Sequence, residues 1–219
     1  MKLPRLAVAA VAATAMLSVS TPLAAQATPA EPAAPSALKN KPLSKVLAPY
    51  GDGWNKKWND YNVVSHAVNA VLEAKPDSAV GVLADGKVKL TAFVPTDRGF
   101  QRLVKDLTGK KLKKERKVYR AALTLGVDTI EQVLLYHVVP GQRITAKKAL
   151  KADGARLTTA QGETIRVNVK RGPVIKLVDR APEIRNPRVL LKQVNINKGN
   201  KQIAHGINRV LLPVPLDAA

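Results

Sequence analysis

The sequence has 219 residues, no cysteine, and 36 lysines and arginines against 16 aspartates and glutamates, a formal net charge of +20. The lack of cysteine excludes disulfides and thiolate metal sites, and a chain of this length buries enough surface to fold on its core alone. The charge predicts attraction to polyanions that weakens with salt, and it leaves the fold undecided.

Residues 1–27 have the features of a secretory signal peptide. Lys2 and Arg5 form a basic start, an apolar run extends from Leu6 to Leu17, and Ala25-Gln26-Ala27 supplies a small-x-small end. The run is too short to span a bilayer. We therefore expect cleavage after Ala27 and a secreted protein, extracellular or associated with the cell wall, with no membrane span.

The exported part divides into a linker and a domain. Residues 28–43 are rich in alanine and proline, a composition that buries little and favours an extended linker. A regular apolar pattern begins at Ser44 and continues without an internal repeat or a second break in composition. We therefore expect one domain over residues 44–215.

A helix and a strand are predicted first in this domain. Asn62 is expected to cap a helix that ends near Lys75-Pro76 and has an apolar face made of Val64, Ala67, Val68, Val71 and Leu72. Residues 87–94 alternate, with Val88, Leu90, Ala92 and Val94 on one side, and predict a half-buried strand.

An abrupt corner follows at Pro95-Thr96-Asp97. Pro95 cannot donate to a β-ladder and ends the strand. Thr96 is a good N-cap, and Asp97 lies at the positive end of the next helix. That helix has apolar residues at i, i+3, i+4 and i+7, beginning with Phe100.

Helices are expected early and strands late. A strongly basic stretch covers residues 110–120, and Asp128 with Glu131 forms a capping-box pattern before an apolar helix. Short strands are then predicted over 155–159, 164–170, 173–179, 188–196 and 202–212. This segregation favours an α+β fold over a doubly wound parallel sheet.

A search for catalytic chemistry finds no motif. The three histidines have no zinc-like spacing, no serine lies in a G-x-S-x-G turn, and residues 108–111 lack the first glycine and the final hydroxyl of a P-loop. We therefore expect no enzyme activity, no metal and no cofactor. His137 and His205 lie among apolar residues, so we expect buried, hydrogen-bonded rings that resist protonation.

Three segments together resemble the signatures of the fasciclin domain family. TAFVPTDRGFQRL resembles the first signature, LLYHVVPG the Tyr-His motif, and IAHGINRVLLP the second signature. The resemblance implies two β-sheets in a wedge or sandwich with helices packed around them. It identifies the following family-motif positions, which we interpret as structural: Thr91, Pro95, Thr96, Asp97, Phe100, Tyr136, His137, His205 and Asn208.

Two positions depart from the family pattern. Asn208 stands where an aspartate is usual, and Gly206 where an apolar residue is usual. In animal members the Tyr-His motif is linked to integrin and cell-surface adhesion, which the resemblance would place at Tyr136 and His137. Their apolar setting favours a place in the core instead.

The resemblance and the charge together predict a non-enzymatic adhesion or binding protein for anionic cell-envelope or matrix polymers. Residues 101–120 hold nine bases against two acids, and 166–192 hold eight against two. We expect polyanion binding by Lys110, Lys111, Lys113, Lys114, Arg116, Lys117 and Arg120. The alternative is a carrier or sensor of an apolar small molecule held between helices and sheet. Nucleic-acid binding is disfavoured by export and by few aromatic residues, and the oligomeric state stays open.

Overall fold

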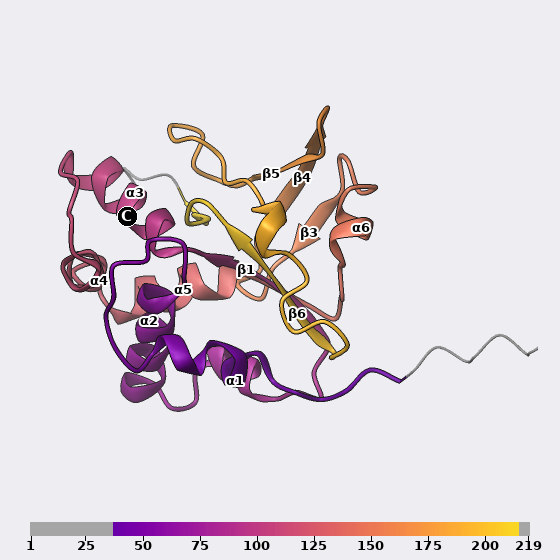
Figure 1. The fold of residues 1–219 in the computed structure, drawn as a ribbon, viewed down its shortest axis with the longest axis horizontal. Coiled ribbons are helices and arrows are strands. Elements are labelled where there is room, and N and C mark those ends of the chain that lie inside the picture. Colours follow the sequence, from indigo (N-terminus) through magenta and orange to yellow (C-terminus); the bar gives the residue numbers. More distant parts are fainter. Residues whose placement is uncertain (1–36, 215–219) are drawn as a thin grey trace, which may run out of the picture. The chain divides into compact units, whose positions relative to one another are not determined.

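Helices occupy mainly the first half of the described chain and strands the second (Figure 1). The structure is a computed structural model that describes residues 37–214. The predicted signal peptide and residues 28–36 of the predicted linker lie outside the described residues. The α-helices are α1 (Leu43–Leu47), α2 (Asn62–Ala74), α3 (Asp97–Thr108), α4 (Glu115–Leu123), α5 (Val127–Tyr136) and α6 (Ala146–Ala149). Three 3-10 helices are η1 (Ala48–Tyr50), η2 (Ala79–Ala84) and η3 (Leu191–Gln193).

Two three-stranded sheets complete this part of the chain. The first has the order β2-β1-β6, with β1 antiparallel to β2 and parallel to β6. The second is antiparallel, with the order β3-β4-β5. The strands are β1 (Leu90–Pro95), β2 (Val138–Pro140), β3 (Arg156–Thr158), β4 (Thr164–Lys170), β5 (Val174–Val178) and β6 (Gln202–Ile207). The predicted α+β fold is confirmed.

The first sheet separates two hydrophobic cores. One core lies on the side of helices α1 to α5, and it includes Ala92 and Val94 of β1. The other lies between the two sheets, and it includes Phe93 of β1 and Ile207 of β6 (Figure 1). Because β1 is covered on both faces, all six of its residues are buried. The prediction of a half-buried strand was therefore wrong at β1.

Three other local predictions were also wrong. Asn62 is the first residue of α2 and not its cap. Asp128 and Glu131 form no capping box, because α5 begins after Gly126 and both carboxylates pair with Lys75 of the segment after α2. Residues 188–196 form no strand and instead make isolated bridges on either side of η3.

The packed part of the chain reaches N-terminal to Ser44. The Lys39 backbone N–H donates to the Gly199 carbonyl at 2.9 Å. Leu43 has no exposed surface, and its N–H donates to Gln202 Oε1 of β6 at 2.7 Å. These contacts attach the start of α1 to the edge strand of the first sheet. No helix within residues 37–214 is both long and apolar enough to cross a membrane.

Candidate functional site

The Pro95-Thr96-Asp97 corner connects β1 to α3. Thr96 occupies the N-cap position of α3, but its side chain makes no capping hydrogen bond. The first N–H groups of the helix instead donate to loop carbonyls, Asp97 to Asp60 at 3.0 Å and Arg98 to Trp58 at 2.8 Å. The Thr96 N–H donates to the carbonyl of Ile207, the last residue of β6, at 3.1 Å. The corner thus joins the loop before α2, α3 and β6.

The carboxylate of Asp97 caps a different helix from the one that it begins. Its Oδ1 accepts the N–H of Val63 at 2.8 Å, and its Oδ2 accepts the N–H of Asn62 at 3.3 Å. These groups are the first donors of α2, which have no partner within the helix. The side chain of Asp97 is fully buried, so the corner fixes the angle between the starts of α2 and α3.

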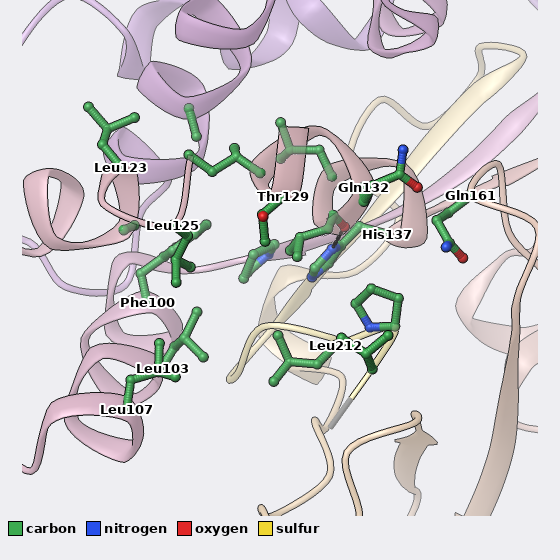
Figure 2. A pocket seen from close by; sticks show the side chains of 18 of the residues that line it. Phe100, Leu103, Leu107, Leu123, Leu125, Thr129, Gln132, His137, Gln161 and Leu212 are labelled. Atoms are coloured by element: carbon green, nitrogen blue, oxygen red, sulfur yellow. Dashed lines mark hydrogen bonds between the residues drawn. The ribbon is translucent and has the colours of Figure 1, made fainter. Parts of the chain in front are cut away.

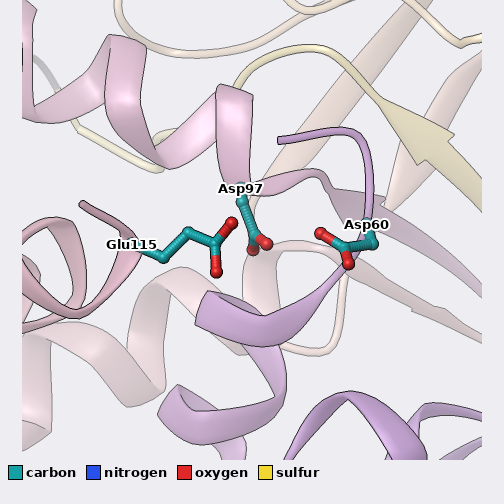
Figure 3. A group of neighbouring side chains, drawn as sticks. All are labelled: Asp60, Asp97 and Glu115. Atoms are coloured by element: carbon teal, nitrogen blue, oxygen red, sulfur yellow. The ribbon is translucent and has the colours of Figure 1, made fainter. Parts of the chain in front are cut away.

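Asp97 belongs to a cluster of three acids with Asp60 and Glu115 (Figure 3). One carboxylate oxygen from each residue lies within 4.8 Å of the corresponding oxygens of the other two. Burial, and then the hydrogen bond with Asp60, raises the pKa of Asp97 to about 8. Burial also raises the pKa of Glu115. A group with this pKa is largely protonated at pH 7, so the cluster shares a proton instead of carrying three charges.

Oxygen ligands of this kind suit hard cations, but most of these atoms already accept hydrogen bonds. Asn55 donates its backbone N–H to Glu115 Oε2 at 2.9 Å and its side-chain amide to Asp60 Oδ2 at 2.8 Å. With the two backbone bonds to Asp97, four of the six oxygens are acceptors. The other two, Asp60 Oδ1 and Glu115 Oε1, are buried without a hydrogen-bond partner among the described residues. We interpret the cluster as a structural support for the loop before α2.

Both motif histidines are buried and have a partner at each ring nitrogen. His137 Nδ1 lies 2.6 Å from the Val133 carbonyl, and Nε2 lies 2.9 Å from the Leu211 N–H. The carbonyl requires a donor and the N–H an acceptor, so the ring is neutral with its proton on Nδ1. His205 has the opposite tautomer, because Nε2 donates to the Ile144 carbonyl at 2.8 Å. Burial lowers the pKa of His137 to about 4 and also lowers that of His205.

Thr91 and Tyr136 likewise connect elements of the core. Thr91 Oγ1 donates to the Gln142 carbonyl and accepts the Ile144 N–H, both at 2.8 Å. The buried Tyr136 hydroxyl donates to the Thr164 carbonyl of β4 at 3.0 Å. These bonds tie the first sheet and α5 to the segments that lead into the second sheet. Tyr136, His137 and His205 are all buried.

A steric constraint explains the glycine at position 206. A Cβ at this position would lie 2.6 Å from the Tyr61 hydroxyl and 2.7 Å from Gln193 Oε1. Both atoms are buried and lack a hydrogen-bond partner among the described residues. The glycine of the second signature segment therefore makes room for two side chains that approach β6.

An apolar cavity of about 340 Å³ lies among α3, α4, α5 and residues 212–214. Figure 2 shows Phe100, Leu103 and Leu107 of α3 on one side and Leu212 with His137 on another. Thr129, Gln132 and Gln161 add a few polar groups to a lining that is otherwise almost wholly apolar. Apolar walls with few polar groups are typical of small-molecule sites. Sequence analysis missed this cavity, because its walls come from segments distant in the chain.

The predicted basic stretch is exposed. All seven bases are exposed, but only Arg116, Lys117 and Arg120 lie on a helix, since α4 begins at Glu115. The lysines before α4 lie on the segment that joins α3 to it. Glu115, by contrast, points inward to the acidic cluster (Figure 3). The only acid of residues 110–120 is therefore buried, and the exposed charges of this stretch are all positive.

Further bases gather at a hollow of about 450 Å³ that sequence analysis did not identify. It is lined by five bases, Arg102, Lys176, Arg185, Arg188 and Arg209, together with Asn186 and Asn208. A neighbouring hollow shares Arg102 and Arg209 and is also lined by Lys111 of the predicted stretch. The five bases are up to 107 positions apart between Arg102 and Arg209, so only the fold brings them together.

The architecture defines a small α+β domain with a helical core, two short sheets and no catalytic constellation among its described side chains. The family model of the fasciclin domain matches residues 62–213, and the chain belongs to this family. Among solved structures, the chain is similar to a domain pair from the insect cell adhesion molecule Fasciclin I. The TM-score is 0.52 and the identity 17%, over 76% of this chain and 50% of that chain. The chain thus spans half the length of that structure, and the likeness concerns the fold.

The comparison with curated proteins gave no match. Membership of the family supports a cell-adhesion or binding role, because fasciclin domains are generally non-enzymatic adhesion modules. They bind other components of the cell surface.

Proposed function

We propose that this chain is a secreted, non-enzymatic fasciclin protein that binds anionic polymers of the cell envelope or matrix through its basic surface. The observation that carries this proposal is the exposure of all seven bases of residues 110–120. Exposed charges keep their hydration and attract a polyanion over about 10 Å at moderate ionic strength. The signal-peptide pattern of residues 1–27 supports export.

The proposal is tested by charge reversal outside the hollow. In the Lys110→Glu, Lys113→Glu, Lys114→Glu, Lys117→Glu variant, we expect earlier elution from heparin and teichoic-acid columns. A matched variant reverses four exposed lysines elsewhere, Lys147, Lys148, Lys151 and Lys198, and changes the net charge equally. Unchanged retention of the first variant, or equal losses in both, would contradict a role for this stretch.

The apolar cavity favours a second candidate function, a carrier or sensor of an apolar small molecule. Its volume of about 340 Å³ falls within the range of small-molecule pockets, roughly 300–1,000 Å³. Burial of an apolar ligand there would gain about 25 cal/mol for each Å² removed from water. The few polar groups, among them Gln132 and Thr129, would orient such a ligand.

Native mass spectrometry of protein purified from its own host tests this candidate, with a co-purifying mass as the expected result. Ala122 lines the cavity, whereas the adjacent Ala121 does not. Ala122→Leu should therefore reduce the bound fraction, and Ala121→Leu should leave it unchanged. Absence of a bound mass from the wild-type protein would reject the carrier function.

A further inference from the structure

The hollow lined by Arg102, Lys176, Arg185, Arg188 and Arg209 has the composition of an anion site. None of the seven residues that line it in the described part of the chain is acidic. Arginine presents several N–H donors in a planar fork that matches oxyanions in pairs. Four guanidinium groups and one ammonium around about 450 Å³ therefore offer many donors, and the lining itself contributes no carboxylate.

The backbone beneath these bases is held firmly. Arg188 forms an isolated antiparallel bridge with Lys176 of β5. Its N–H donates to Asn208 Oδ1 at 2.8 Å, and its carbonyl accepts the Asn208 N–H at 3.1 Å. Arg188 is therefore fixed between β5 and the segment after β6. The backbone positions of Arg188 and Lys176 are therefore set before a ligand binds, which lowers the entropic cost of binding.

A second set of contacts fixes the opposite wall. Arg102 of α3 donates to the Asn208 carbonyl at 2.8 Å. A Cβ at Gly99 would come within 3.2 Å of Arg209 Cα, so α3 and this segment approach closely. Asn208 thus joins both walls, with its carbonyl to Arg102 and its side-chain oxygen to Arg188.

The positive charges of this region are only partly compensated. Arg209 pairs with Asp106 at 2.5 Å. Burial, followed by the neighbouring charges of Arg209 and Arg98, lowers the pKa of Arg102. Like charges held together by the fold repel one another, and a bound anion relieves that repulsion.

Resting on the proposed polyanion function, we propose that this hollow binds a single phosphate group of a phosphate-bearing polymer. A phosphate offers several acceptor oxygens to converging arginines, whereas a carboxylate offers two and carries one charge. The exposed bases of residues 110–120 supply general attraction, and Lys111 connects that stretch to the hollow through the neighbouring one. The hollow then selects phosphate among the anionic groups of the envelope.

Asn208 lines this hollow with a neutral side chain. Its Oδ1 already accepts the Arg188 N–H, and an aspartate of the same shape would accept that bond as well. Asn208→Asp therefore adds one negative charge with little change in structure. We expect it to weaken phosphate binding at least tenfold while the melting temperature stays near that of the wild type.

The experiment titrates the wild-type protein with inorganic phosphate, acetate and a poly(glycerol phosphate) chain by calorimetry at fixed ionic strength. The phosphate and polymer arms separate a free-phosphate site from a polymer site. The variants are Asn208→Asp and the exposed pair Arg185→Glu, Arg188→Glu, with Lys147→Glu, Lys148→Glu as a control of equal charge change. The quadruple lysine variant of residues 110–117 is titrated in parallel.

Saturable binding of the polymer, weakened in both hollow variants and retained in the control, supports the inference, whereas binding of free phosphate without the polymer overturns it. Loss of phosphate but not of polymer binding in the hollow variants, or equal affinity for acetate, overturns it. Equal losses in the control also overturn it. The quadruple lysine variant should lose polymer retention and keep phosphate binding, so failure of the hollow and failure of the proposed function give different results.

Discussion

The Asp97 carboxylate lies 2.8 Å from the N–H of Val63, so the residue that begins α3 caps α2. The two residues are 34 positions apart, and no local capping pattern includes both. Because burial, and then the neighbouring Asp60 and Glu115, raise its pKa, Asp97 retains a proton that an exposed aspartate would release. Its role is therefore best tested by separating its charge from its hydrogen bonds.

The effect of replacing Asp97 on stability should depend on whether the new side chain can accept hydrogen bonds from the first N–H groups of α2. Asp97→Ala leaves two buried N–H groups without a partner and is expected to lower the free energy of unfolding by about 3 kcal/mol. Asp97→Asn resembles the protonated acid and keeps one acceptor oxygen for the Val63 N–H, but its NH2 group cannot accept the longer bond from the Asn62 N–H. We therefore expect a smaller loss than in the alanine variant, about 1 kcal/mol at pH 7. Denaturant unfolding of both variants measures the difference. Equal losses would show that the cluster needs the charge of Asp97.

Acid should destabilise the domain through His137. Burial lowers its pKa in the folded state from 6.5 to about 4, so the unfolded chain binds a proton between these values and the folded chain does not. Stability from this group is therefore complete above pH 6.5 and is lost as the pH falls towards 4. The loss amounts to about 3 kcal/mol, at 1.36 kcal/mol for each pKa unit.

A variant without the imidazole isolates this effect. Asp97 and Asp179 act in the opposite direction, because burial raises their pKa values to about 8 and about 6 and their folded forms bind protons more tightly. These terms are common to the wild type and to His137→Gln. The stability difference between the two proteins should therefore narrow from pH 7 to pH 4. A constant difference would mean that His137 is protonated equally in both states.

The contact between Gly206 and Tyr61 predicts coupling between the two positions. Gly206→Ala places a Cβ 2.6 Å from the Tyr61 hydroxyl and should cost about 1–3 kcal/mol through overpacking. Tyr61→Phe removes a hydroxyl without a partner among the described residues and should be nearly neutral. In the double variant we expect the alanine to cost less, which a double-mutant cycle of unfolding free energies measures. Additive effects would show that Gln193 alone opposes the new Cβ.

The order and type of the main elements could be predicted from the sequence, because apolar periodicity and turn residues act locally. The bounds of α2, α3 and β4 are close to those expected. The burial of β1 on both faces could not be predicted, since Lys87 and Lys89, which indicated a solvent face, precede its first residue, Leu90. The second cover comes from the other sheet, which follows much later in the chain.

Sites made of residues close together in the sequence could be predicted, and sites assembled from distant segments could not. Residues 110–120 are recognisable because seven bases are adjacent in the sequence. The hollow is not, because Arg102, Lys176, Arg185, Arg188 and Arg209 come from α3, β5 and two separate connecting segments. Likewise, an N-cap rule assigned Thr96 to α3, whereas carbonyls of residues 58 and 60 accept the first donors of that helix. Tertiary contacts replaced the local cap.

Thr91 provides a test of whether the signature segments are structural. Its side chain has no exposed surface, and its hydroxyl donates to Gln142 and accepts from Ile144. Thr91→Val keeps the shape and removes both bonds, which leaves the Gln142 carbonyl and the Ile144 N–H without this partner. Because both groups are only partly buried, the expected loss is that of two hydrogen bonds, about 1–3 kcal/mol of unfolding free energy.

Thr91→Ser is the matched variant, because it keeps the hydroxyl and removes one methyl group. We expect it to lose only about 1 kcal/mol, the value of one buried methyl or methylene group. Since Thr91 lies on β1 and both its partners follow β2, the valine variant should also speed hydrogen exchange at Ile144 more than the serine variant does. Equal effects of the two substitutions on stability and on exchange would show that packing, and not the pair of hydrogen bonds, determines the residue at this position.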